Sequence, residues 1–569
     1  MSSIDRNTKT TFTLKLFKMH MGLRRIFVLL PLFFFCCFSY AQKKDLDTLE
    51  TVVNKSANYS IANATKINDN PGYSDSTARI PAQHYSISPK QMVTTFELAP
   101  IKPAKMVGEP LTHLYNSIVK LGFGNYTTPY LEGFYNSLRS KEYSYGVHVK
   151  HLSSKSTLAD YGNSSYSDNE INLYGKRFFG KQTLFANFDY ARNVVHYYGY
   201  DTKAITINND DAIRQRFSFI NPSLRLLSHY SDSTHYNYDL RLKYYNLLDL
   251  YNANENNISA EAIVKGYYDK QLITLGAGVD YYNTRTAKDT TNNTILHLSP
   301  SLAFAGNKWN VNVGVTVVGD FAKESKFFFF PNIDFNFNVV DNIIIPYAGV
   351  SGGLDKNSYK SMSDINPFIS PTVSLVNTDR KVEVYGGLRG TVESNTSYNV
   401  KATWSTISNM PFFVTDESDL LKNKFSLIYD DVTYLNIHGE LGYQQTEKIK
   451  FIAKGDYFHY TTTNEIRAWY KPEVQITGSV HYNLRDKIVV KGDIFYIGKQ
   501  LAKTFDTEGK AVPKELKGIV DINLGAEYKY SKLFTLFANL NNIAGMRYYR
   551  WNNYPTQRFM IMGGLMVTF

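Results

Sequence analysis

From about residue 115 to the C-terminus, the chain consists of segments of about ten residues in which apolar and polar side chains alternate. In the segment 519–530, every even-numbered residue is apolar or aromatic, whereas the odd-numbered positions include Asp521, Asn523 and Glu527. Successive residues of a β-strand point to opposite faces. Each of these segments is therefore predicted to be a strand with one apolar and one polar face.

The chain offers no other way to cross a membrane. A spanning helix needs about 20 consecutive apolar residues, and no such stretch follows residue 41. The only other spanning structure is a closed β-barrel, because hydrocarbon offers no partners to backbone N–H and C=O groups. We predict 22 strands, near 115–125, 129–137, 143–152, 166–178, 182–198, 214–227, 234–248, 256–268, 271–282, 294–305, 309–319, 326–339, 343–355, 368–391, 397–414, 424–444, 449–460, 472–483, 487–497, 519–530, 534–540 and 557–569.

The connections between these segments support a barrel over a soluble β-sandwich, which would also show alternating strands. Every second connection is tight, as at Gly180-Lys181 and Asp269-Lys270, and those between are mostly longer, such as 199–213 and 498–518. Bacterial outer-membrane barrels have short periplasmic turns and longer outer loops. The predicted fold class is all-β, an antiparallel transmembrane outer-membrane β-barrel of about 22 strands with both termini on the periplasmic side.

The N-terminus has the order of a secretory signal peptide. Basic residues through Arg25 precede an apolar run from Ile26 to Phe38, and a small residue, Ala41, closes the segment. An amphipathic or anchor helix is the alternative. We expect three parts: a signal peptide over 1–41, a mostly extended periplasmic or lumenal segment over 42–114, and the barrel over 115–569. The protein is then expected in the outer membrane, in contact with lipid.

The composition argues against thiol, metal and nucleic-acid chemistry. The only two cysteines, Cys36 and Cys37, lie inside the signal, so the exported chain has no thiol. Of the net charge of +11, residues 1–41 contribute six basic and one acidic side chain, and the remaining excess is weak for a nucleic-acid partner. His148 and His151 would point to opposite faces of a strand and could not share a metal. We expect no enzyme activity, no catalytic, cofactor or metal site, no cofactor and no nucleic-acid partner.

The polar faces of the strands are expected to line the lumen. Lumen-facing charges are predicted at Lys491, Asp493, Asp521 and Glu527. They would either act on a solute or simply solvate the interior and pair with one another.

The last predicted strand ends on an aromatic residue. Its apolar face carries a set of large residues: Phe559, Ile561, Leu565, Val567 and Phe569. Outer-membrane barrels have similar C-termini, where the outer-membrane assembly machinery reads the last strand. The resemblance implies a C-terminal assembly signal here.

The final 37 residues resemble the end of a TonB-dependent receptor. Three elements carry the resemblance: a Leu-Asn-Asn motif, an aromatic loop and a Gly-Gly strand that ends in Phe, here Leu540, Asn541, Asn542, Tyr548, Tyr549, Trp551, Tyr554, Pro555, Gly563, Gly564 and Phe569. The Tyr40-Ala41-Gln42 junction resembles exported proteins of the Bacteroidota. The resemblance implies a receptor-like outer-membrane barrel.

The segment before the barrel departs from that family. Receptors of this type carry a folded plug, and residues 42–114 are too few for a full one. Glu50, Thr51, Val52 and Val53 resemble the short box through which such receptors contact TonB. The alternative is a periplasmic tail or a short segment in the lumen.

Three functions remain open on the sequence. The first is transport of a solute across the outer membrane, and the second is a structural or docking subunit of an outer-membrane assembly or export complex. The third is a TonB-coupled receptor with a reduced plug. The sequence identifies no substrate.

Overall fold

The computed structural model describes residues 114–569, apart from 287–288, 323, 506–507 and 509. The expected signal peptide, the segment 42–113 and the TonB-box-like residues 50–53 lie outside this range. In the described part, no helix is both long and apolar enough to cross a membrane.

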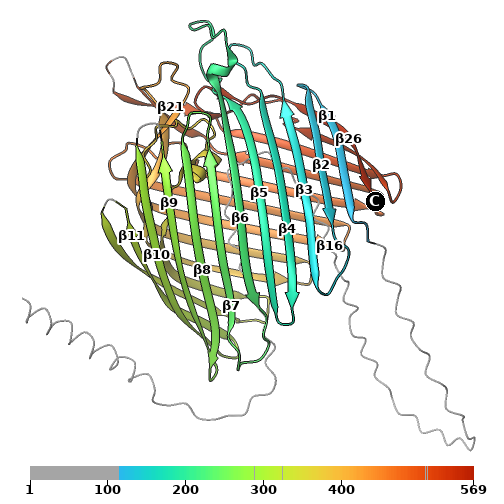
Figure 1. Ribbon diagram of the computed structural model, residues 1–569, viewed down its shortest axis with the longest axis vertical. Coiled ribbons are helices and arrows are strands. Elements are labelled where there is room, and N and C mark those ends of the chain that lie inside the picture. Colours follow the sequence, from blue (N-terminus) through green and yellow to red (C-terminus); the bar gives the residue numbers. More distant parts are fainter. Residues whose placement is uncertain (1–113, 287–288, 323, 506–507, 509) are drawn as a thin grey trace, which may run out of the picture. The chain divides into compact units, whose positions relative to one another are not determined.

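Twenty-two antiparallel strands form one closed sheet, in which β1 pairs with both β2 and the last strand, β26. Figure 1 shows β1 to β11 side by side on the near wall, with strands of the C-terminal half behind them. The first half of the ring is β1 (Ser117–Gly124), β2 (Thr128–Asn136), β3 (Tyr143–Ser154), β4 (Tyr166–Phe179), β5 (Gln182–His196), β6 (Arg214–Ser228), β7 (Asn237–Leu248), β8 (Asn254–Tyr268), β9 (Gln271–Arg285), β10 (Thr290–Ala305) and β11 (Trp309–Phe321).

The second half of the ring completes the predicted number of strands. It is made of β12 (Ser325–Phe337), β13 (Ile345–Asp355), β14 (Thr378–Val392), β15 (Thr396–Thr415), β16 (Phe425–Gln445), β17 (Ile449–Thr462), β18 (Val474–Leu484), β19 (Ile488–Ile497), β22 (Ile519–Lys529), β23 (Phe534–Asn541) and β26 (Met560–Thr568). The predicted antiparallel outer-membrane barrel of 22 strands is confirmed.

The two ends of the barrel differ in their connections. The longest periplasmic turn is 229–236, whereas the outer loops 197–213, 356–377, 498–518 and 542–559 are each more than twice as long. The tight turn after β4 places Gly180 at φ +59, a conformation in which a side chain is disfavoured. Short turns on one side and long loops on the other match the predicted orientation.

The outer loops contain further secondary structure. Two hairpins lie there, β20 (Gln500–Phe505) with β21 (Ala511–Leu516), and β24 (Tyr549–Trp551) with β25 (Tyr554–Pro555). A 3-10 helix, η1 (Asp210–Ile213), precedes β6, and the short helix α2 (Tyr359–Ile365) lies between β13 and β14.

One predicted strand was too long. The strand expected over 368–391 begins only at Thr378, and residues 368–377 belong to the loop that follows α2. Ile369 and Val373 in this loop are buried in a cluster formed with other outer loops. Apolar residues that suggested a strand face therefore pack inside the outer end of the barrel.

Strand facing follows the predicted alternation. On β22, Leu524 and Tyr528 are exposed on the outer surface, whereas Asp521, Asn523 and Glu527 are only partly exposed. Leu524 pairs with Gly492 and with Leu540 on the neighbouring strands. Apolar side chains thus cover the outside of the wall and polar ones the inside, as a barrel in lipid requires.

Candidate functional site: a lid over the outer mouth

Six outer loops fold inward and pack together at the outer end of the barrel. They are 197–213, 356–377, 416–424, 463–473, 498–518 and 542–559, and we refer to them together as the lid. Buried apolar side chains of four of these loops (356–377, 463–473, 498–518 and 542–559) form one cluster with the outer ends of β6, β7, β15 and β16. Loop 197–213 forms a second cluster through Tyr197, Tyr200 and Ile213, against which Phe368 and Leu421 pack. The lid therefore has its own core, unlike a set of independent solvated loops.

Hydrogen bonds connect loops that arise from opposite walls. The Asn423 side-chain amide, in the β15–β16 loop, donates to the carbonyl of Tyr197, which directly follows β5, at 2.6 Å. The Tyr197 hydroxyl donates to the carbonyl of Ile369 at 3.0 Å. In a ring of 22 strands, β5 and β15 are ten strands apart and so nearly opposite. The lid consequently spans the mouth of the barrel.

The β23–β26 loop joins the same junction from a third side. The Tyr554 hydroxyl donates to the carbonyl of Asn423, and the Tyr198 hydroxyl donates to the carbonyl of Pro555 at 2.9 Å. Tyr554 also stacks on Phe368, with ring centroids 3.8 Å apart. Burial raises the pKa of Tyr554 well above its usual range, so the hydroxyl stays a donor at physiological pH.

An aromatic group forms the centre of the lid. Trp551 lies 4.9 Å from Tyr470, 5.1 Å from Phe413 and 5.5 Å from Phe425, measured between ring centroids. All four side chains are buried. Each such ring pair contributes about 0.5–1.5 kcal/mol beyond its buried area. Trp551 belongs to the aromatic loop that suggested the receptor resemblance, and its role here is to pack the lid.

Helix α2 is held against the wall by one buried carboxylate. Glu255, at the outer end of β8, is fully buried and accepts the backbone N–H groups of Tyr359 at 2.7 Å and Lys360 at 3.2 Å. It also accepts the hydroxyls of Tyr245 at 2.9 Å and Thr284 at 2.8 Å. A carboxylate at the first turn satisfies free N–H groups and interacts favourably with the helix dipole.

A second carboxylate anchors the same helix. Asp249, just after β7, accepts the Tyr359 hydroxyl at 3.0 Å and the Gln215 amide at 3.1 Å. The backbone N–H groups of Tyr251 and Ala253 donate to it at 2.8 and 2.7 Å. Burial raises the pKa of Asp249, and these donors partly oppose that effect. The barrel wall therefore holds α2 in place through hydrogen bonds to Glu255 and Asp249, two acidic residues that the sequence analysis did not single out.

Below the lid, the lumen wall carries paired charges. Glu132 on β2 is almost completely buried, 3.6 Å from Lys120 and 3.2 Å from His148. Between β16 and β17, His438 lies 2.9 Å from Asp456. Such pairs solvate one another within the wall and leave a polar surface inside the barrel.

The predicted lumen-facing charges lie on one stretch of this wall. Asp493 accepts the Ser479 hydroxyl at 2.6 Å, and Asp521 accepts the Tyr548 hydroxyl, from the loop before β26, at 2.6 Å. Lys491 lies on the same strand as Asp493, opposite Gly525, and Glu527 lies on β22, opposite Val489. Asp493 and Asp521 therefore have hydrogen-bond partners within the protein. The four predicted residues do not form a single cluster around which a solute could bind.

The residues of the predicted C-terminal signal lie on β26 and at its ends. Phe559, Ile561 and Phe569 are exposed on the outer surface, and Leu565 and Val567 are partly exposed. The strand is paired on both sides, with β23 and β1. Its role in assembly remains a prediction.

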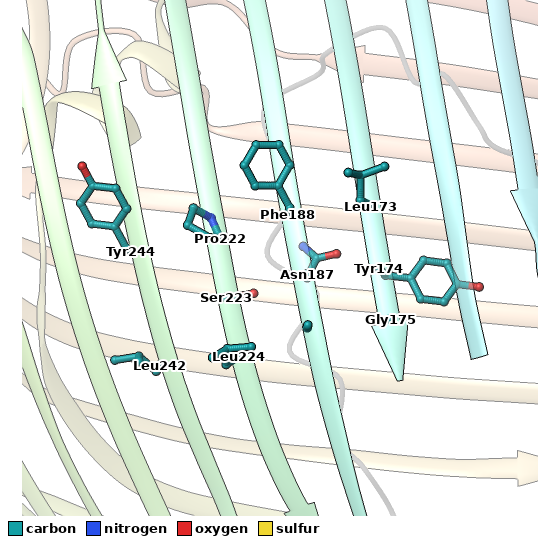
Figure 2. A pocket seen from close by; sticks show the side chains of 11 residues that line it. Leu173, Tyr174, Gly175, Asn187, Phe188, Pro222, Ser223, Leu224, Leu242 and Tyr244 are labelled. Carbon is teal, nitrogen blue, oxygen red and sulfur yellow. The ribbon is translucent and has the colours of Figure 1, made fainter. Parts of the chain in front are cut away.

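The lipid-facing wall has a shallow apolar hollow, shown in Figure 2. It forms where Gly175 on β4 is paired with Ala186 on β5, between the larger side chains of Leu173, Phe188 and Leu224. Those three side chains are exposed on the outside of the barrel. The hollow is therefore part of the lipid-facing surface and lies off the path through the lumen. In residues 114–569, setting aside the six undescribed positions, no group of three or more His, Cys, Asp or Glu is placed to hold a metal ion.

No protein-family model and no curated protein matches the sequence. Solved structures do match the fold. The FrpB iron transporter from Neisseria meningitidis aligns with a TM-score of 0.64 over 81% of this chain and 82% of its own, at 9% identity. The ferric-catecholate import receptor Fiu from Escherichia coli K12 aligns at 0.62 over 80% and 82%, also at 9% identity. The ferripyoverdine receptor of the Pseudomonas aeruginosa outer membrane aligns at 0.61 over 80% and 72%, at 11% identity.

These neighbours are TonB-dependent receptors, so the predicted resemblance to that class is confirmed at the level of the fold. They are named as receptors and a transporter and not as enzymes, in agreement with the expected class of protein. The proposed lack of a full plug concerns residues outside the described range.

Proposed function

We propose that this protein transports a solute across the outer membrane through its barrel, and that the lid controls access from outside. The observation that carries the proposal is the lid itself, whose loops meet across the mouth and share a buried core. A barrel that only filled space in the membrane would have no need of such a closure. The polar, charge-paired wall beneath it suits a hydrated path.

The fold neighbours support a receptor-like mode of transport. They are named for iron transport, ferric-catecholate import and ferripyoverdine binding, so ferric chelates are the first solutes to test. We further propose that Glu50, Thr51, Val52 and Val53 engage TonB, and that the assembly machinery reads the strand ending in Phe569.

Proteoliposomes test the proposal. Purified protein should release entrapped small solutes only slowly when the lid is intact, and faster when the lid is loosened by Glu255→Gln. Tightly sealed vesicles for both proteins would contradict transport. Energised uptake is tested in cells, where loss of the proton-motive force or deletion of residues 50–53 should abolish accumulation of the chelate.

A docking subunit is the second candidate, favoured by apolar side chains on the outer loops. Leu420 is 89% exposed in the β15–β16 loop, and Ile466 is 55% exposed in the β17–β18 loop. Exposed apolar residues outside the strands are typical of a surface that contacts a partner. Co-purification from mild detergent separates the two functions: a docking subunit retains a stoichiometric partner, which Leu420→Asp and Ile466→Asp should release without changing solute flux.

A further inference from the structure

One ladder between neighbouring strands of the barrel has far fewer residue pairs than the others. We call each such strand–strand ladder a joint. β12 and β13 are paired at only four positions, from Ile333↔Val350 to Asn336↔Tyr347. The other joints have from six to 18 pairs. Among the described residues, the outer parts of these two strands, 325–332 and 351–355, are not paired with each other. We call this unpaired stretch the seam.

Both strands remain paired on their other sides. β12 continues along β11 as far as Phe321↔Ser325, and β13 continues along β14 as far as Asp355↔Thr378. The seam is thus an interruption between two intact parts of the wall. At about 3.3 Å per residue, the five residues 351–355 span about 16 Å in the outer half of the barrel.

Two features of the strands coincide with the place where the pairing stops. Continued in register, the ladder would place Pro331 opposite Gly352. Proline has no N–H to donate to a ladder. β13 also has an irregularity between Ser351 and Gly353, where its register with β14 shifts. A Cβ at Gly352 would lie 2.7 Å from Phe330 Cδ1, so the Phe330 ring occupies this level of the seam.

The outer side of the seam is apolar and unusually exposed. Phe327 is 64% and Phe329 is 70% exposed. At paired positions of the same strand, Ile333 is 38% and Phe335 is 41% exposed. The difference follows from the missing neighbour on one side. In the membrane, hydrocarbon is what lies against these rings.

The lumenal side of the seam is apolar too. Phe330 is 2% exposed and packs in a cluster with Tyr282, Ile295 and Val318, which Phe328 and Leu354 extend. Elsewhere the lumen wall below the lid is dominated by polar and charged groups. At the seam, β12 therefore presents apolar rings on both the outer and the lumenal face of the wall.

The seam is also the place where the wall separates at least cost. Opening any other joint breaks at least six ladder pairs, whereas opening this one breaks four. Backbone groups without partners are costly in hydrocarbon. Pro331 reduces that cost, because it has no N–H to leave unsatisfied.

We propose that the seam is a lateral binding site for the acyl chain of an outer-leaflet lipid, which enters between β12 and β13 and reaches the Phe330 cluster. At the seam β12 contributes phenylalanine rings to both faces, and β13 contributes Gly352, Gly353 and Leu354. A hydrocarbon chain would therefore contact mainly apolar atoms there, with the Asp355–Arg380 ion pair at the outer end. Lys326, 62% exposed on its side chain at the outer end of β12, places an ammonium group near the lipid phosphates, although Glu324 lies 3.7 Å from it. The site does not depend on transport through the lumen.

Photocrosslinking tests the proposal. Phe330 is replaced by p-benzoylphenylalanine, and the purified full-length protein is placed in phosphatidylethanolamine vesicles with a fluorescent acyl chain. The matched control is the same replacement at Phe458, a lumen-facing phenylalanine on the outer half of β17, in a joint with 14 pairs. Phe329 serves as the lipid-facing positive control. We expect several-fold more lipid adduct at 330 than at 458, and equal labelling would overturn the proposal.

A disulfide across the seam supplies the second readout. The exported chain lacks cysteine, so Asn332→Cys with Ser351→Cys forms a defined pair one step beyond the last ladder position. Formation of this disulfide should abolish lipid labelling at 330 and leave labelling at 329 unchanged. Unchanged labelling at 330 after locking would contradict entry through the seam. If Phe330 cannot be replaced without loss of the heat-modifiable barrel, Phe328 in the same cluster takes its place. A protein adduct at 330 in cells, instead of a lipid adduct, would overturn the proposal in favour of strand addition by a partner.

Discussion

Removing the charge of Glu255 should release α2 from the wall. In Glu255→Gln, the side-chain amide keeps one acceptor oxygen but presents an N–H₂ group where the carboxylate received a backbone N–H. Hydrogen bonds to charged groups contribute about 1.5–3 kcal/mol each, and the helix-dipole interaction adds about 0.3–1 kcal/mol. Because one of the two backbone bonds can persist, we expect docking of α2 to weaken by about 2–4 kcal/mol.

Hydrogen exchange followed by mass spectrometry measures this loss. If the amides of 359–366 exchange through undocking, their protection should fall by the factor that corresponds to the lost free energy, roughly 30- to 700-fold. Exchange in the periplasmic halves of the strands should not change.

Glu132→Gln is the matched control. Glu132 is as buried as Glu255 and accepts the Tyr130 hydroxyl at 2.6 Å, but it lies on β2, and its other partners, His148 and Lys120, are also wall residues below the lid. The substitution should leave exchange of 359–366 unchanged. Equal protection of α2 in wild type and Glu255→Gln would refute the view that this carboxylate anchors the lid.

Three further predictions follow from the same contacts. Trp551→Ala removes the ring that contacts Tyr470, Phe413 and Phe425, so the free energy of lid opening should fall by about 3–5 kcal/mol. Hydrogen exchange of 463–473 should then be faster, and unchanged exchange would argue against a common lid core. Leu524→Arg places a charge on the lipid face and should lower barrel stability by roughly 2–4 kcal/mol near the midplane. Asn523→Arg, on the lumen side, should lower it much less. Equal losses of heat-modifiable barrel in the two variants would show that the facing of β22 is wrong. The raised pKa of Asp249 means that the folded lid favours the protonated acid, so this group's contribution is full at low pH and is lost as pH rises through the folded pKa. The protection of 249–253, corrected for the intrinsic pH dependence of amide exchange, should fall over that range in wild type and not in Asp249→Asn.

The strands could be predicted because a membrane barrel imposes a simple pattern. Each residue of β22 faces either lipid or lumen, so its polarity alternates with a period of two, and Leu524 and Asn523 report the two sides. Short turns such as Gly180-Lys181 add an independent marker, since only small or polar residues adopt the required conformation.

The lid could not be predicted, because its parts lack a periodic signal. The seven residues of α2 are too short for a helical pattern, and Val373 and Leu375 alternate with polar neighbours as a strand would. Glu255 and Asp249 appear in the sequence as ordinary polar residues of strand ends. Their role depends on loops from distant parts of the chain meeting at the mouth. Pro331 lies within a predicted strand, but so do Pro222 and Pro300, so the sequence did not mark the seam.

Single-channel recording tests the central claim most directly. Two variants are compared, both lacking residues 42–110, whose deletion should leave a heat-modifiable barrel. One keeps the lid, and in the other residues 358–375 are replaced by a short Gly-Ser linker, which removes α2 and its partners in the buried cluster. If the lid closes the mouth, the first variant should stay mostly closed and the second should show a steady, larger conductance. Identical conductance in two correctly folded variants would contradict a gated path through the barrel.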